Sequence, residues 1–214
     1  MAKISERMRS MICSRRDLLI AAGLVAFPQL AIGELTKTAW QSEGPFYPDR
    51  MPEDRDNDLV LNGASTRRAG GQTLSLAGLL TDQQSQPLSG LAVEIWQTDM
   101  NGIYLHRRSY NHSMRDRHFQ GYGRTITDNM GRFQFRTILP VPYPGRTPHI
   151  HMKILDASRG MLTTQLYLKE HPSNERDFLF KALNDLEREM NSLKLTRNSG
   201  GVHSKFSSSV RIVV

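Results

Sequence analysis

Two histidines separated by one residue, His149 and His151, are the first candidates for chemistry in this sequence. They lie in the run His149–Ile154, which alternates with the period of a β-strand. Side chains at positions i and i+2 of a strand point to the same face, so both imidazoles can reach one point. Such a pair is half a metal site. Taken alone, it also fits a surface pair or a hydrogen-bonded structural pair.

Two tyrosines can complete a metal site around these histidines. Tyr143 lies six residues before His149, between two prolines that exclude a helix there, and Tyr104 follows the run Trp96–Ile103. A single tyrosine more often packs in the core with its hydroxyl hydrogen-bonded. Two phenolates with two imidazoles would instead form a doubly negative ligand set, which suits Fe(III) better than Zn(II) or Cu(I). Because the tyrosine pKa is ordinarily about 10, the metal itself would have to drive ionisation.

The elements that must position these residues are predicted to be short strands. Runs with period-two alternation and with β-branched or aromatic residues follow turn residues at several points. They cover Thr73–Leu80, Ala92–Gln97, Arg132–Thr137, His149–Ile154, Thr163–Leu168 and Val210–Val214. Their number and spacing predict a mainly β fold, an antiparallel β-sandwich over residues 73–214. The polar segment 34–72 is predicted to be an extended arm lying over this body.

One segment near the C-terminus breaks the strand pattern and predicts a single helix. Pro172 precedes it, Ser173 or Asn174 can cap it, and the polar, glycine-containing run 197–201 ends it. Its apolar residues are predicted to share one face. They are Phe178, Leu179, Ala182, Leu183, Leu186, Met190 and Leu193. The helix is expected to serve packing or an interface and to take no part in the chemistry.

The first 33 residues have the layout of an export signal. A basic start is followed by the pair Arg15-Arg16, an apolar run over residues 18–32, and the small residues Ala31 and Gly33 before Glu34. This order resembles a twin-arginine signal. The apolar run is about fifteen residues, fewer than the roughly 20 that span a bilayer as a helix. We expect a periplasmic protein, or a membrane-tethered one if the signal is not cleaved.

Composition and charge limit the alternatives. The chain has 214 residues and a single cysteine, Cys13, which excludes a disulfide framework and zinc sites built on cysteine pairs. The net charge is +7, but residues 1–33 carry five basic and two acidic residues, which leaves +4 for the remainder. The remaining basic residues are scattered and form no basic helix, so a nucleic-acid partner is not expected.

Several stretches of the chain occur in an order that is specific to one family. They are Glu43–Pro48, Leu88–Gln97, Gly102–Tyr104, Gly121–Arg124, Thr127–Asp128, Gly131–Thr137, Pro148–His151 and Thr164–Tyr167. Across most of residues 40–170 the chain thereby resembles the intradiol ring-cleavage dioxygenases, particularly the protocatechuate 3,4-dioxygenase branch. The resemblance implies a non-haem Fe(III) enzyme. It would use O2 to cleave a protocatechuate-like catechol between the two hydroxylated carbons, giving a cis,cis-muconate-type diacid.

The resemblance also implies a role for each site residue. The four metal ligands would be Tyr104, Tyr143, His149 and His151. Tyr143 would leave the metal when substrate binds and accept one of its protons. Arg146 would stabilise negative charge developing on the substrate, and Gln165 would line the pocket. Trp96 matches a tryptophan near the same site, although a core role fits it as well.

The chain departs from the family pattern at the loop that carries Tyr143. Tyr143 and His149 are only six positions apart, and Gly145 stands where protocatechuate enzymes tend to have a tryptophan. A more open pocket is expected on that side, which leaves the ring substituent of the substrate undetermined. The expected partners are the catechol, O2 and the export machinery, and a homo-oligomer is compatible with the sequence. The alternative is an exported β-sandwich that binds a metal or ligand without dioxygenase activity.

Overall fold

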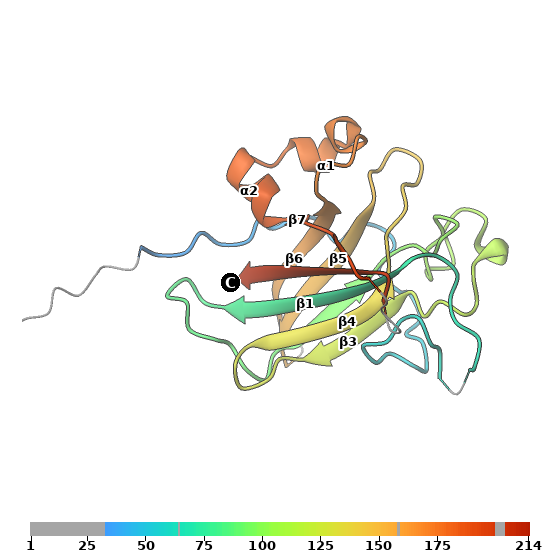
Figure 1. Cartoon of the computed structure of the whole chain (residues 1–214), viewed down its shortest axis with the longest axis horizontal. Coiled ribbons are helices and arrows are strands. Elements are labelled where there is room, and N and C mark those ends of the chain that lie inside the picture. Colours follow the sequence, from blue (N-terminus) through green and yellow to red (C-terminus); the bar gives the residue numbers. More distant parts are fainter. Residues whose placement is uncertain (1–32, 64, 158, 200–203) are drawn as a thin grey trace, which may run out of the picture. The chain divides into compact units, whose positions relative to one another are not determined.

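Short strands of alternating polarity form two sheets in the computed structural model, which describes residues 33–63, 65–157, 159–199 and 204–214 (Figure 1). The first sheet has the order β4 (Arg132–Ile138), β1 (Thr73–Thr81), β9 (Phe206–Val213) and β8 (Thr196–Arg197). The second has the order β3 (Tyr122–Ile126), β2 (Ala92–Trp96), β5 (His149–Asp156), β6 (Arg159–Leu168) and β7 (Ser192–Leu193). Neighbours pair antiparallel except β1 with β9 and β6 with β7, which are parallel. The predicted β-sandwich is confirmed.

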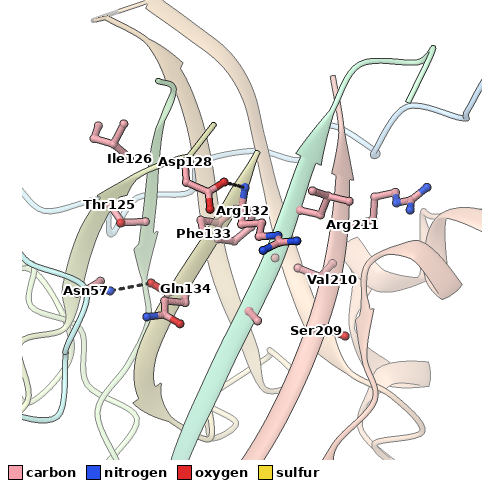
Figure 2. A pocket seen from close by; sticks show the side chains of 13 residues that line it. Asn57, Thr125, Ile126, Asp128, Arg132, Phe133, Gln134, Ser209, Val210 and Arg211 are labelled. Carbon is pink, nitrogen blue, oxygen red and sulfur yellow. Dashed lines mark hydrogen bonds between the residues drawn. The ribbon is translucent and has the colours of Figure 1, made fainter. Parts of the chain in front are cut away.

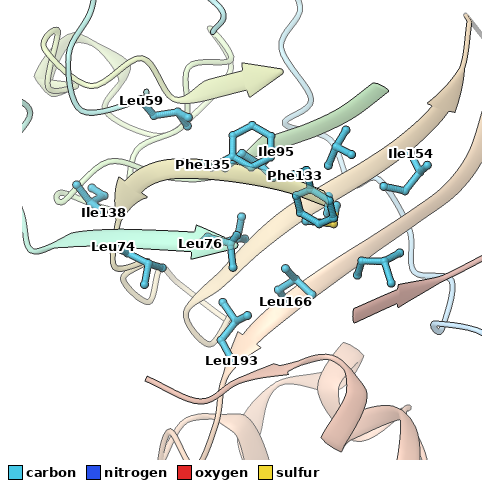
Figure 3. Close-up of a cluster of buried hydrophobic side chains, with 14 of the residues drawn as sticks. Leu59, Leu74, Leu76, Ile95, Phe133, Phe135, Ile138, Ile154, Leu166 and Leu193 are labelled. Atoms are coloured by element: carbon cyan, nitrogen blue, oxygen red, sulfur yellow. The ribbon is translucent and has the colours of Figure 1, made fainter. Parts of the chain in front are cut away.

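The core lies between the two sheets because each strand turns its apolar positions inward. Leu74 and Leu76 of β1 are fully buried against Ile95 and Leu166 of the second sheet, with Phe133 of β4 beside them (Figure 3). Burial of this kind is the main stabilising contribution to such a fold. It also sets the orientation of the second sheet. In β2 and β5 the apolar positions face the core, so the positions between them face outward.

The predicted arm runs along the outside of the sandwich and covers exposed backbone. The described part of residues 34–72, which leaves out residue 64, forms turns, bends and isolated β-bridges. The amide of Thr38 bonds to the carbonyl of Val213, and the amide of Gln41 bonds to that of Thr163. Further along, segment 55–59 donates to and accepts from the backbones of β3 and β4, which are edge strands. Closing these edges removes unpaired N–H and C=O groups.

The prediction of a single C-terminal helix is wrong. The chain instead forms two short helices, α1 (Phe178–Lys181) and α2 (Asp185–Met190), which lie beside β6 and β7 (Figure 1). Two 3-10 turns, η1 (His112–Met114) and η2 (Asn174–Arg176), complete the helical segments of the described residues. The side chain of Asp177 caps α1, and a capping box centred on Asn184 begins α2, so the helical run is interrupted between them.

The prediction that the apolar residues of this segment share one helix face is wrong for the same reason. Phe178 and Leu186 are exposed, whereas Leu193 leaves the helical segment and is fully buried in β7. The strands β3, β7 and β8 were not predicted, since β7 and β8 have two residues each and β3 carries polar residues at its centre. The predicted export signal lies outside the described residues. Among the helices that the structure does describe, none has the length and apolar character needed to cross a bilayer.

Candidate metal centre

The outer face of the second sheet carries most of the residues that the sequence singled out. Register places Trp96 of β2 opposite His151 of β5, and His151 opposite Gln165 of β6. His149 is likewise opposite Tyr167. Directly opposed residues point to the same face, so these five side chains form one patch. All five are buried, and Phe46 and Tyr47 of the arm pack with Tyr104 and Tyr143 in the aromatic cluster around Trp96.

Three potential ligand atoms converge above this patch. The Nε2 atoms of His149 and His151 are 3.2 Å apart, and the hydroxyl oxygen of Tyr104 lies 3.2 Å and 3.0 Å from them. The Nδ1–H of His149 donates to the carbonyl of Thr147 at 2.7 Å, so its Nε2 lone pair points to the shared centre. Atoms with lone pairs directed at one point are arranged to bind a cation.

Burial keeps both imidazoles uncharged and available as ligands. It lowers the pKa of His149 to about 3, and the nearby Arg146 guanidinium adds to this effect. The pKa of His151 is also lowered, first by burial and then by His149 and Arg146. Neutral imidazole is the form that binds metals. The Nδ1 atom of His151 is buried without a hydrogen-bond partner among the described residues.

The second tyrosine comes from the loop before β5. The ring centroid of Tyr143 is 5.5 Å from those of Tyr104 and His149. A tight turn holds it there, in which the amide of Arg146 donates to the Tyr143 carbonyl at 2.9 Å. Gly145 has φ +81° in this turn, a conformation that favours glycine. A Cβ atom added at position 145 would meet nothing within 4 Å.

The Tyr104 oxygen needs a cation in order to ionise. The pKa of Tyr104 is raised well above its usual value, first by burial and next by the neighbouring Tyr143. A bound metal ion is the kind of charge that reverses this preference. Within the described residues, no group of three or more His, Cys, Asp and Glu side chains is placed to hold a metal. The two histidines are accompanied by tyrosines, and this set fits a hard, highly charged ion.

Arg146 borders the same centre. Its Nη1 lies 3.4 Å from the Tyr143 hydroxyl, and its Nη2 donates to Oε1 of Gln165 at 2.5 Å. Gln165 in turn donates to the Ser42 carbonyl of the arm at 3.2 Å. The structure thus brings together all six predicted site residues. It places Gln165 against Arg146 and the arm.

Sequence reasoning missed two groups that touch this centre. The first is Asp177, whose buried carboxylate accepts from Nε of Arg146 at 2.8 Å. A signal for it was present, since an aspartate directly before an apolar run is a helix start. The second is Phe46 of the arm, whose ring stacks on Tyr104 with centroids 5.0 Å apart. It belongs to a stretch that was noticed only as part of the resemblance.

The arm also supports the far side of the patch. Tyr47 packs edge-on against Trp96, and the indole of Trp96 stacks on the imidazole of His151 with centroids 4.7 Å apart. The Tyr47 hydroxyl donates to the buried carboxylate of Glu94 at 2.8 Å, and Arg124 donates to the same carboxylate. Trp96 therefore fixes the plane of the His151 ring, and Tyr47 fixes Trp96.

A hollow of about 760 Å³ lies elsewhere, over β1, β4 and β9 (Figure 2). Leu79, Arg132 and Arg211 are among its lining residues, and none of the six predicted site residues is. Its carboxylate, Asp128, accepts the backbone amides of Met130 and Arg132 and so serves the turn before β4. The hollow brings together no set of groups comparable with the histidine–tyrosine centre, where we place the candidate chemistry.

Comparison with known proteins agrees with this placement. A family model described as Dioxygenase matches residues 42–203. The protocatechuate 3,4-dioxygenase beta chain of Burkholderia cepacia is 31% identical over 153 residues, which cover 68% of this chain and 65% of that protein. Catechol 1,2-dioxygenase of Candida albicans is 26% identical over 208 residues, covering 84% and 65%. The chain thus matches about two thirds of the length of these two curated relatives.

A solved structure resembles the fold over a longer share of its own length. It is the dioxygenase domain of a dioxygenase–carbohydrate-binding protein fusion from Streptomyces sp. SirexAA-E. The two chains are 28% identical with a TM-score of 0.64, and the match covers 84% of this chain and 98% of that one. The histidine–tyrosine centre lies within residues 42–203, which the family model matches.

Proposed function

This chain belongs to the family of intradiol ring-cleavage dioxygenases, and on that premise we propose that it is an Fe(III)-dependent enzyme acting on a protocatechuate-like catechol. The proposed reaction opens the ring between the two hydroxylated carbons, inserts both atoms of O2 and gives a cis,cis-muconate-type diacid. The observation that carries the proposal is the convergence of Tyr104, His149 and His151 on one point, with Tyr143 beside them.

The proposed roles follow from position. A ferric ion held by the two imidazoles and two phenolates would polarise a bound catecholate toward O2. Tyr143 is the more accessible tyrosine, so its oxygen is placed to accept a proton from a catechol hydroxyl. Arg146 presents Nη1 beside that oxygen and is placed to stabilise negative charge on the substrate. The ring of Phe46, which stacks on Tyr104, is an apolar surface that would limit the access of water to the ring of the bound catechol.

The first prediction tests this proposal directly. Purified protein supplied with ferric iron is expected to show a visible tyrosinate-to-iron charge-transfer band that shifts when a catechol is added. Oxygen uptake with protocatechuate, catechol and hydroxyquinol would then identify the preferred ring substituent, and the ultraviolet spectrum of the product would report the diacid. Tyr143→Phe should alter the band because it removes a ligand.

The matched control for that experiment is Tyr110→Phe. Tyr110 is 80% exposed, and its removal should leave the band and turnover unchanged. A colourless protein that takes up no iron would overturn the proposal. A protein that binds iron, keeps its band in Tyr143→Phe and consumes no oxygen with any catechol would support the binding module without dioxygenase activity.

We also propose that the chain reaches the periplasm through its paired arginines. A charge-preserving change, Arg15→Lys with Arg16→Lys, is expected to retain the folded protein in the cytoplasm, because the signal is read as an arginine pair. Cell fractionation measures this, with Arg7→Lys and Arg9→Lys as the control. An unchanged periplasmic fraction in the first variant would contradict the proposal.

A further inference from the structure

The carboxylate of Asp177 accepts four hydrogen bonds next to the candidate centre. One oxygen, Oδ1, accepts the amides of Leu179 and Phe180 at 2.9 Å and 3.1 Å. The other, Oδ2, accepts the amide of Thr147 at 2.9 Å and Nε of Arg146 at 2.8 Å. Although burial raises the pKa of this carboxyl, these donors outweigh the effect, and its pKa lies below the usual value. Asp177 is therefore charged.

Its contact with Arg146 decides where the guanidinium points. A guanidinium is a rigid plane, so fixing two of its nitrogens fixes the third. Nε is held by Asp177, and Nη2 is held by Oε1 of Gln165 at 2.5 Å. Nη1 is left facing the Tyr143 hydroxyl at 3.4 Å. The exposed ring of Phe178 lies 5.6 Å from Cζ and covers the guanidinium.

Capping a helix does not require this arrangement. The amides at the start of α1 use only Oδ1, whereas Oδ2 is directed back to Arg146 and Thr147, two residues before His149. The Arg146–Asp177 pair is also almost completely buried, with 10% and 0% of the two side chains exposed. A cation close to a metal centre repels the metal unless it is paired, and the buried carboxylate supplies that pairing.

We propose that Asp177 is a positioning residue for the ring-cleavage reaction. It holds Arg146 with Nη1 toward the Tyr143 oxygen and compensates its charge beside the metal. This inference rests on the proposed function and goes beyond it. Asp177 makes no contact with substrate in this proposal, so every effect of Asp177 on turnover is expected to pass through Arg146.

The first variant to test this is Asp177→Asn. The amide can still cap α1 through its oxygen, but it then turns an NH2 group toward Nε of Arg146, so two donors face each other. Turnover is expected to fall about 100-fold, as for a misplaced catalytic group. Asp177→Ser, which caps α1 but is too short to reach Arg146, should behave alike. Asn184→Ala is the matched control, because it removes the cap of α2 and touches no site residue.

A double-mutant cycle separates positioning from simple stability. If Asp177 acts through Arg146, then Asp177→Asn combined with Arg146→Lys should be no slower than Arg146→Lys alone. Asn184→Ala should lower the unfolding temperature but leave kcat unchanged. Losses that multiply in the double variant, or a loss of kcat in Asn184→Ala that matches its loss of stability, would overturn the proposal.

A second readout does not depend on activity. In the proton–nitrogen spectrum of the metal-free full chain, the Nε–H of Arg146 should give a sharp, slowly exchanging signal, assigned by its absence in Arg146→Lys. The signal should vanish in Asp177→Asn and persist in Asn184→Ala. A signal that persists in Asp177→Asn would overturn the proposal. An iron-loaded wild type that cleaves no catechol would overturn the proposed function, whereas loss of the signal with unchanged turnover would overturn only the positioning role.

Discussion

Replacing His149 by alanine is expected to abolish ferric-ion binding and, with it, ring cleavage. The neutral Nε2 of His149 is directed at the centre because its Nδ1–H is held by the Thr147 carbonyl. Outer partners of metal ligands are commonly worth about 10–100-fold in affinity or activity, and loss of a direct ligand should exceed that. Iron content by mass spectrometry and the visible band measure the effect. The band should be lost at iron concentrations that saturate the wild type.

Stability provides a second measurement for the same variant. A ligand that binds only the folded state raises stability in proportion to RT ln(1 + [L]/Kd), so iron should raise the unfolding temperature of the wild type. It should not do so for His149→Ala. His118→Ala is the control, because His118 is half-buried and does not belong to the converging set of Tyr104, His149 and His151. If His149→Ala retains stoichiometric iron, the assignment of His149 as a ligand is wrong.

Replacing Arg146 by lysine is expected to reduce kcat/KM by about 100- to 1,000-fold while leaving the protein folded and loaded with iron. Removal of a single preorganised group that stabilises charge typically costs this much. Lysine keeps the positive charge that the buried Asp177 requires, but it cannot bond to Asp177 and Gln165 while also facing Tyr143. The loss should therefore appear in turnover without a loss of iron.

Lysine is the informative substitution because glutamine would leave Asp177 charged, buried and unpaired. Removing one partner of a buried ion pair costs about 3–5 kcal/mol, so glutamine would add a loss of stability to any loss of turnover; the same cost applies to Asp177→Asn, whose unfolding temperature is therefore measured alongside its kcat. Arg136→Lys is the matched control, since it changes the Arg136–Asp58 pair on the other sheet and keeps the charge. Steady-state kinetics on the preferred catechol, with iron content measured in parallel, give the comparison. Equal kcat/KM in Arg146→Lys and the wild type would remove Arg146 from the chemistry.

Much of the fold could be predicted from local pattern. The alternation in β1 and β4 is strong because one face of each strand is packed in the core and the other is more exposed. In β5 polar and apolar residues alternate although both of its faces are buried. The C-terminal helix was mispredicted because its apolar spacing is helical over a long stretch. Two capping side chains, Asp177 and Asn184, divide that stretch, and Leu193 gains more from the core than from the helix.

The candidate site was predictable to a different extent at each residue. His149 and His151 share a face because strand geometry requires it, so sequence spacing was enough. Tyr104 and Tyr143 come from loops, whose direction no periodicity reports. Their place around the histidines made them candidates, and the resemblance to the family assigned them as ligands. Asp177 was missed because its partner is 31 residues away in sequence, and only folding brings the two together.

The sequence by itself determined the β-sandwich, the pair of histidines on one strand face and the family to which the chain belongs. These rest on local periodicity and on motif order, which tertiary structure is not needed to see. Only the tertiary structure decided that Asp177 and Gln165 hold Arg146, and that the arm places Phe46 and Tyr47 over the site. Such contacts join residues from separate elements, and the packing of the core fixes their distances.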